Sequence, residues 1–151
     1  MSAVTFVDSN ILIYAHDRDA GVKRERAMAK LRELWDCGTG RLSVQVLQEF
    51  YVNATHKLAT PLARSTAREL IQTYGVWVRH ATTVETVTRA TEIADLARLS
   101  FWDALIVASA EQSAAEELLS EDFNDGQAIA GIRVVNPLQP GHWVNERNDG
   151  R

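Results

Sequence analysis

Four acidic residues occupy places in this sequence where a carboxylate is hard to explain structurally: Asp8, Glu49, Asp103 and Asp122. Asp8 separates two apolar runs, 4–7 and 11–15, and Asp103 interrupts an almost wholly apolar stretch. A carboxylate that enters a protein interior is costly unless it is paired, hydrogen-bonded or bound to a metal. Carboxylates brought together repel one another unless a divalent cation holds them. The four residues therefore predict a Mg²⁺ or Mn²⁺ site.

The segments around these residues predict the elements that must position them. Short apolar runs predict strands over 3–7, 76–78, 118–120 and 132–135. Helical spacing and capping residues predict helices over 11–16, 22–36, 42–58, 62–73, 83–98 and 101–113. Strands that alternate with helices favour an α/β layer fold around a mostly parallel sheet. Asp8 and Asp122 each follow a predicted strand, and sites in such sheets lie beyond the carboxyl ends of the strands.

Each acidic residue also has a purely structural interpretation. Asp8 is a suitable N-cap for the helix that follows it. Asp103 would stand at the third position behind a Ser100 cap, where a carboxylate interacts well with the helix dipole. Capping alone does not explain why a helix that is apolar on every side should carry a charge.

The other two acidic residues are weaker signals when each is taken alone. Glu49 lies beside the apolar stripe of its predicted helix, where a lone glutamate is usually solvated. Asp122 and Asp125 precede Gly126 and could serve as turn residues. The argument depends on the whole set, because only a fold can bring residues so distant in sequence together.

Length and composition indicate one domain over residues 1–151 that is able to bury a core. The net charge of −4 argues against broad electrostatic wrapping of nucleic acid, although it permits a nuclease with an acidic metal site. A single cysteine, Cys37, fits a reducing cytoplasm, and no stretch is long and apolar enough for a membrane span. We expect a cytoplasmic protein.

The sequence resembles the PIN-domain ribonucleases, and among them the VapC toxins of prokaryotic toxin–antitoxin pairs. Four pieces carry the resemblance, in family order and spacing, over essentially the whole chain: DSNILIYA at 8–15, QEF at 48–50, SFWDALI at 100–106 and LSED at 119–122. Any one piece would be weak evidence, whereas all four in order are specific.

The resemblance implies a three-layer α/β/α sandwich with a metal cluster at the carboxyl edge of its sheet. Asp8, Glu49 and Asp103 match the family's most dependable acidic positions, and Asp122 matches a more variable fourth. Asn10 and Ser120 match polar residues that support the site. Whether Asp125 contributes stays open. The resemblance also implies an RNA substrate, a cognate antitoxin and a homodimer.

Metal-assisted hydrolysis of RNA phosphodiesters suits these residue types. Mg²⁺ prefers oxygen ligands and keeps several waters, so a few carboxylates suffice. Asp8 and Asp103 are expected to bind the metal, Glu49 to orient or deprotonate the attacking water, and Asp122 to complete the site or hold a second ion. The family implies products with a 5′-phosphate and a 3′-hydroxyl. The four histidines show no metal-ligand spacing.

Substrate contacts are less clear from the sequence. The basic stretch over 18–32 could guide an RNA backbone, but interleaved Glu25 and Glu33 favour a solvated helix face. Trp102 could stack on a base, but an aromatic residue at such a position more often packs into the core.

Other functions fit less well. A haloacid-dehalogenase-type phosphatase needs a second aspartate at position 10, which is Asn10. A receiver-like domain needs a late lysine, and the last lysine here is Lys57. A stand-alone PIN nuclease of RNA processing and a scaffold that only binds RNA or a partner remain alternatives.

Overall fold

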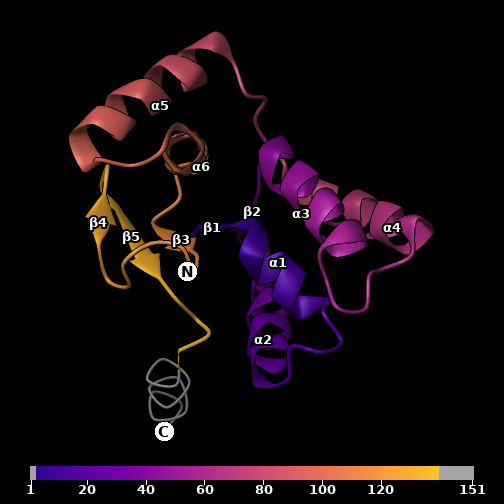
Figure 1. Cartoon of the computed structure of the whole chain (residues 1–151). Helices are drawn as coiled ribbons and strands as arrows, with labels where there is room; N and C mark the ends of the chain where they lie inside the picture. Colours follow the sequence, from indigo (N-terminus) through magenta and orange to yellow (C-terminus); the bar gives the residue numbers. More distant parts are fainter. Residues whose placement is uncertain (1–2, 140–151) are drawn as a thin grey trace, which may run out of the picture.

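A five-stranded sheet forms the centre of the computed structural model, which describes residues 3–139 (Figure 1). Its strand order is β2-β1-β3-β5-β4. The strands are β1 Thr5–Val7, β2 Gly40–Arg41, β3 Glu117–Leu119, β4 Ala128–Ile129 and β5 Ile132–Val135. All neighbours are parallel except β4 and β5, which pair as an antiparallel edge hairpin. The predicted α/β fold with a mostly parallel sheet is confirmed.

The register of the strands brings their carboxyl ends to one edge of the sheet. Val7 pairs with Leu119, and Leu119 pairs in turn with Val135. The segments after these three residues therefore leave the sheet side by side. Asp8 directly follows β1 and Ser120 directly follows β3, so the two residues are neighbours at this edge of the sheet. We call it the carboxyl edge.

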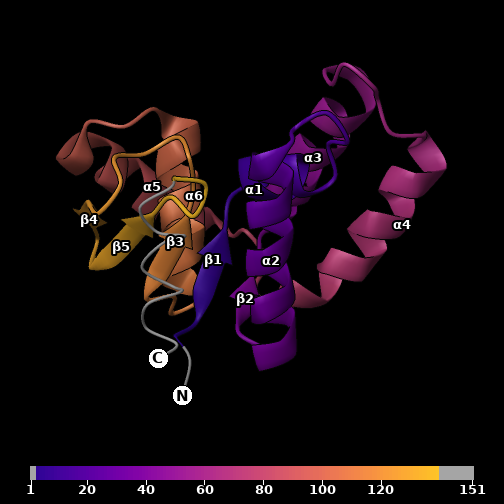
Figure 2. The same ribbon diagram turned by 90° about the horizontal axis from the view of Figure 1, so that it is seen from below.

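Helices cover both faces of the sheet. They are α1 Ser9–Ala15, α2 Val22–Cys37, α3 Val44–His56, α4 Arg64–Tyr74, α5 Val84–Ala97 and α6 Phe101–Gln112. Figures 1 and 2 show α5 and α6 together on one side of the strands and α1 with α2 on the other. The α3–α4 pair extends away from the α5–α6 pair in both views. The helices thus form the outer layers expected of an α/β sandwich.

Local sequence signals explain where the helices begin and end. Thr83 and Thr86 form a reciprocal capping box at the start of α5, and the Ser100 hydroxyl accepts a hydrogen bond from the Asp103 N–H at the start of α6. Gly38 ends α2 in the left-handed conformation at φ 69°. The residues of α6 from Ala104 to Ala110 are all buried, as its apolar sequence predicts.

The predicted strand over 76–78 is wrong. Gly75–Trp77 forms a 3₁₀ turn, η1, and only Val78 makes an isolated parallel bridge, to Leu42. The buried Trp77 ring lies against Gly40, where an added Cβ would stand 2.6 Å from the ring. This close approach explains the error, because the apolar run serves to cover the sheet edge rather than to extend the sheet.

Two short strands, β2 and β4, were not predicted, since two-residue edge strands carry no periodic pattern. The remaining predicted strands and helices are present, with ends that differ by at most two residues. Within residues 3–139, no helix is long and apolar enough to cross a membrane.

Candidate active site

Asp8 occupies the floor of the carboxyl edge, directly after β1. It is the N-cap of α1, and its Oδ1 accepts a hydrogen bond of 2.7 Å from the Ser9 N–H. Its Oδ2 accepts another of 2.7 Å from the Ser120 hydroxyl, which follows β3. The side chain thus joins the start of α1 to the end of the neighbouring strand β3. The capping interpretation of Asp8 is correct, yet it accounts for only one of the two carboxylate oxygens.

The environment of Asp8 disfavours its charged form. Asp8 is only 3% exposed, and this burial raises its pKa to about 7 despite the hydrogen bonds from Ser120 and Ser9. The negative charges of Asp122 and Glu49 raise the pKa further. A carboxylate that is buried among other carboxylates gains most from a nearby cation.

An amide and a hydroxyl join Asp8 to Asp122. Asn10 Nδ2 donates to Asp122 Oδ2 at 3.0 Å, and it lies 3.3 Å from the Ser120 hydroxyl and 3.5 Å from Asp8 Oδ2. The Ser120 Oγ also accepts a hydrogen bond of 3.0 Å from the Asp122 N–H. Asn10 and Ser120 therefore hold the two acidic side chains on opposite sides of one polar cluster, which fits their predicted supporting role.

Glu49 reaches the same edge from α3. The Ser9 hydroxyl donates to Glu49 Oε2 at 3.3 Å, whereas the buried Oε1 accepts no hydrogen bond of good geometry from any described residue, although the Gln45 side chain lies near the carboxylate. Burial raises the pKa of Glu49 despite the hydrogen bonds from Gln45 and Ser9, and the nearby charges of Asp103 and Asp122 raise it further. Glu49 is therefore electrostatically close to both of these acids. Its unsatisfied Oε1 is the kind of oxygen that a cation or a bound water would complete.

Asp103 enters from the first turn of α6. Its backbone N–H is capped by Ser100, and the side chain is partly exposed. The Gln45 amide donates to the Trp102 carbonyl at 3.2 Å and so ties α3 to this turn. The carboxylate takes no part in the cap, so the capping interpretation explains the position of the residue but not its charge.

Asp122 and Asp125 differ in their partners. Asp122 is exposed and faces the cluster through Asn10, whereas Asp125 Oδ1 accepts a hydrogen bond of 2.8 Å from the Asn136 N–H. Asp125 thus holds the loop after β3 against the end of β5. This contact assigns Asp125 the turn role that the sequence had left open for both residues.

A clamp of Tyr14, Lys23 and Glu121 was not predicted from the sequence. The Tyr14 hydroxyl donates to Glu121 Oε1 at 2.7 Å, and Lys23 pairs with Glu121 Oε2 at 2.8 Å. The Glu121 N–H donates to Asn10 Oδ1 at 3.3 Å. The clamp joins α1 and α2 to the loop that carries Asp122. The only sequence signal for the clamp was the position of Glu121, which stands directly before Asp122.

Other residues singled out in the sequence serve the structure or the surface. The basic stretch is partly engaged, since Lys23 pairs with Glu121 and Lys30 pairs with Glu33. Trp102 is 64% exposed, so the core interpretation of its ring is wrong. His16 Nε2 lies 2.8 Å from the Tyr74 hydroxyl, which is a structural contact. His142 lies outside the described residues.

The donor set fits a hard divalent cation. The four acids offer only oxygen ligands, which Mg²⁺ and Mn²⁺ prefer, and the Glu49 Oε1 has no other described partner. Among residues 3–139, however, no three His, Cys, Asp or Glu side chains are gathered closely enough to hold an ion. Mg²⁺ retains several waters in most protein sites, so a few direct carboxylate ligands suffice.

Comparisons with known proteins bear on the fold of the chain. No curated protein matches the sequence. A toxin–antitoxin complex from Klebsiella pneumoniae has a chain with a TM-score of 0.63 at 20% identity, covering 88% of this chain and 97% of that one. The DNA-bound VapBC from Salmonella typhimurium gives 0.61 at 17% identity, covering 90% and 99%. VapC20 from Mycobacterium tuberculosis, a toxin that cleaves the sarcin–ricin loop, gives 0.55 at 19% identity, covering 85% and 98%.

At these identities the solved structures show a shared fold. The family model for the PIN domain matches residues 5–127, which include all four acidic residues and the strands β1, β2 and β3. The chain belongs to the PIN domain family.

Proposed function

We propose that this protein is an endoribonuclease that depends on Mg²⁺ or Mn²⁺. The observation that carries the proposal is the buried Asp8 carboxylate, whose pKa is raised by burial and by two other acids at the same sheet edge. Burying a carboxylate beside other carboxylates lowers the stability of the folded protein, so folding alone does not explain this arrangement. It is useful in a site that receives a divalent cation. Membership of the PIN domain family supports the same chemistry.

The four acidic residues are assigned different roles according to their positions. Asp8 and Asp103 would hold the metal from the floor and from α6, and Asp122 would complete the site or hold a second ion. A bound Mg²⁺ or Mn²⁺ supplies Lewis acidity and lowers the pKa of a coordinated water. The raised pKa of Glu49 suits a group that orients the attacking water and accepts its proton at the unsatisfied Oε1. Attack in line would leave a 5′-phosphate and a 3′-hydroxyl.

The biological role we propose is the toxin of a VapBC-type toxin–antitoxin pair, acting on RNA in the cytoplasm as a homodimer. The similar solved structures include a toxin–antitoxin complex and a DNA-bound VapBC. An apolar groove between α3 and α4, which includes Leu47, Tyr51 and Ile71, also supports a protein partner. Val44 and Val52 on its rim are 48% and 49% exposed, an unusual display of apolar surface.

The test is cleavage of total cellular RNA by purified protein freed of any partner, with Mg²⁺ or Mn²⁺ against EDTA. Asp8→Ala is the matched inactive variant, and Asp95→Ala, which removes an exposed carboxylate on α5, is the control. We expect metal-dependent fragments from the wild type and the control but not from Asp8→Ala. Folded, partner-free protein that is inert with both metals would contradict the nuclease and favour a scaffold that only binds RNA or a partner.

A further inference from the structure

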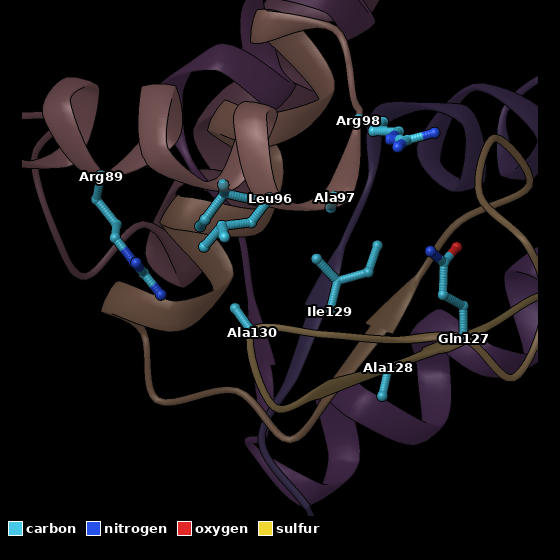
Figure 3. Close-up of a pocket in the computed structure, with 9 residues that line it drawn as sticks. Arg89, Leu96, Ala97, Arg98, Gln127, Ala128, Ile129 and Ala130 are labelled. Atoms are coloured by element: carbon cyan, nitrogen blue, oxygen red, sulfur yellow. The ribbon is translucent and has the colours of Figure 1, made fainter.

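A groove separate from the acidic cluster opens between α5 and the β4–β5 hairpin (Figure 3). Its volume is about 430 Å³, within the range of about 300–1,000 Å³ that is usual for small-molecule sites. The buried side chains of Ile93 and Ile129 contribute apolar surface to it. Leu96 on its α5 side is 80% exposed. The groove thus offers an apolar face of the kind on which a flat ring can lie.

The groove begins near the carboxyl edge. Arg98 and Gln127 lie at one end, and Arg89 and Ala130 at the other (Figure 3). Arg98 stands two residues before Ser100, which caps the helix that carries Asp103. Gln127 is the last residue of the loop that carries Asp122. Its N–H donates a hydrogen bond to the Asn124 carbonyl, and its carbonyl accepts one from the Val134 N–H. One end of the groove is therefore continuous in sequence with two of the segments that bring acids to the site, the start of α6 and the loop after β3.

The charge of the groove is opposite to that of the acidic cluster. Two arginines line it and no carboxylate does. The Arg89 guanidinium is engaged by Glu111 at 2.8 and 3.0 Å and by Glu92 at 3.3 Å. Arg98 is exposed, and no hydrogen bond or ion pair joins its side chain to another residue of the described chain. Arg98 is therefore available to an anion beside the acidic edge.

The backbone at Arg98 makes its side chain notable. Arg98 ends α5 in the left-handed conformation at φ 56°, where glycine is the usual residue. A residue with a Cβ costs conformational free energy at such a position. Arg98 thus presents an exposed guanidinium at a position where the backbone itself would favour glycine.

We propose that this groove binds one nucleotide of the RNA, next to the phosphodiester that is cleaved. The Arg98 guanidinium would hold a phosphate through paired N–H donors, which suit phosphate geometry. The base would lie on the apolar face at Ile129 and Leu96, and the Gln127 amide would offer hydrogen bonds to the base edge. The inference rests on the proposed function, since it names where the RNA of that reaction is held.

The test compares Arg98→Gly with Arg68→Ala. Glycine adopts the left-handed backbone freely, so Arg98→Gly removes the guanidinium while keeping or raising the melting temperature. Arg68 is an exposed arginine on α4, a helix on the opposite side of the molecule from α5. The probe is a fluorescently labelled single-stranded RNA of random sequence, with binding measured in EDTA at several salt concentrations.

We expect Arg98→Gly to bind this RNA about tenfold more weakly and Arg68→Ala to bind as the wild type does. The slope of log K against log salt should also shrink by about 0.7 in Arg98→Gly, since one phosphate contact is lost. A purely structural effect would not change that slope. Cleavage of total RNA by Gln127→Ala should shift in sequence preference, because that amide would read a base.

Two results would overturn the subsite while leaving the nuclease in place. One is wild-type cleavage together with unchanged affinity and slope in Arg98→Gly. The other is equal weakening by Arg68→Ala, which would indicate diffuse electrostatic binding. A wild-type protein that neither binds nor cleaves RNA would instead refute the proposed function. The subsite proposal, which depends on that function, would then also be refuted.

Discussion

The floor and the rim of the acidic site hold their carboxylates in different ways. The floor, Asp8 with Ser9 and Ser120, is buried, and both oxygens of Asp8 accept short hydrogen bonds. The rim consists of Asp103, which is partly exposed, and Asp122, which is exposed. The backbone N–H of each is hydrogen-bonded to a serine hydroxyl, in the first turn of α6 for Asp103 and in the loop after β3 for Asp122. A negative charge destabilises the folded protein more on the buried floor than on the exposed rim. The floor should therefore affect stability as well as metal binding and activity, whereas the rim should affect metal binding and activity with little effect on stability.

The largest effect is expected from Asp8→Asn, which should abolish metal-dependent RNA cleavage and stabilise the metal-free protein at neutral pH. The pKa of Asp8 in the folded protein is about 7, against an ordinary value of 3.8 for an aspartate. Because the folded pKa is raised, the stability from this group is present below pH ~4 and is lost as pH rises through ~7. Asparagine keeps the shape without the charge, for a gain on the order of 2–4 kcal/mol above pH 7.

Urea unfolding in EDTA at pH 5 and pH 8 measures this effect. The wild type should be less stable at pH 8, and Asp8→Asn should show a smaller loss, with a remainder from Glu49, whose pKa is also raised. Asp95→Asn, at an exposed position on α5, is the control and should behave as the wild type. Equal pH dependence in all three proteins would show that the floor is not electrostatically costly.

On the rim, Asp103→Asn should also abolish cleavage, but with the fold and its pH dependence unchanged. The Asp103 N–H supplies the contact to the Ser100 cap, so the carboxylate is not needed for it. Ser100→Ala is the matched variant: it removes the cap, should cost about 1 kcal/mol and should retain cleavage. Circular dichroism with an RNA cleavage assay separates the two. Unfolding of Asp103→Asn would instead show that the carboxylate is structural.

Mg²⁺ should raise the melting temperature of the wild type by relieving the repulsion on the floor. At 100 times its Kd a ligand stabilises by about 2.7 kcal/mol, or roughly 5–10 °C for a chain of this size. Asp8→Asn should show little of this increase. A melting curve with and without Mg²⁺ tests this, and an equal increase in both proteins would place the ion elsewhere.

The smallest effect is expected from Asp122→Asn. The residue is exposed, and Asn10 and Ser120 would still hold its loop. We expect a loss of less than about tenfold in the cleavage rate, or ~1.4 kcal/mol. Initial rates over a Mn²⁺ titration would measure it. A loss as complete as that of Asp103→Asn would show that cleavage needs both rim carboxylates and that Asp122 is not the lesser of the two.

The sequence predicted the elements that have strong patterns of their own. The apolar run before Asp8, the caps at Thr83 and Ser100, and the apolar helix α6 are all local signals, and the structure confirms them. The segment 76–78 was misread because its partner is Gly40, and no local pattern reveals that contact.

The same distinction applies to the site. Its acidic residues could be selected because a carboxylate in an apolar context is conspicuous. The Tyr14–Lys23–Glu121 clamp and the Arg98 groove join residues that are ordinary in their own segments. Only the fold brings these partners together, so the sequence alone could not identify them.

The contact between Gly40 and Trp77 also constrains how this protein can diverge. Any side chain at position 40 would begin within 2.6 Å of the indole ring, too close for either to stay in place. The ring also packs against Trp35 and Tyr74, at centroid distances of 5.6 and 5.5 Å, so it has little room to move. Across homologues, residue 40 should enlarge only where residue 77 has become smaller, and the two positions should therefore change together.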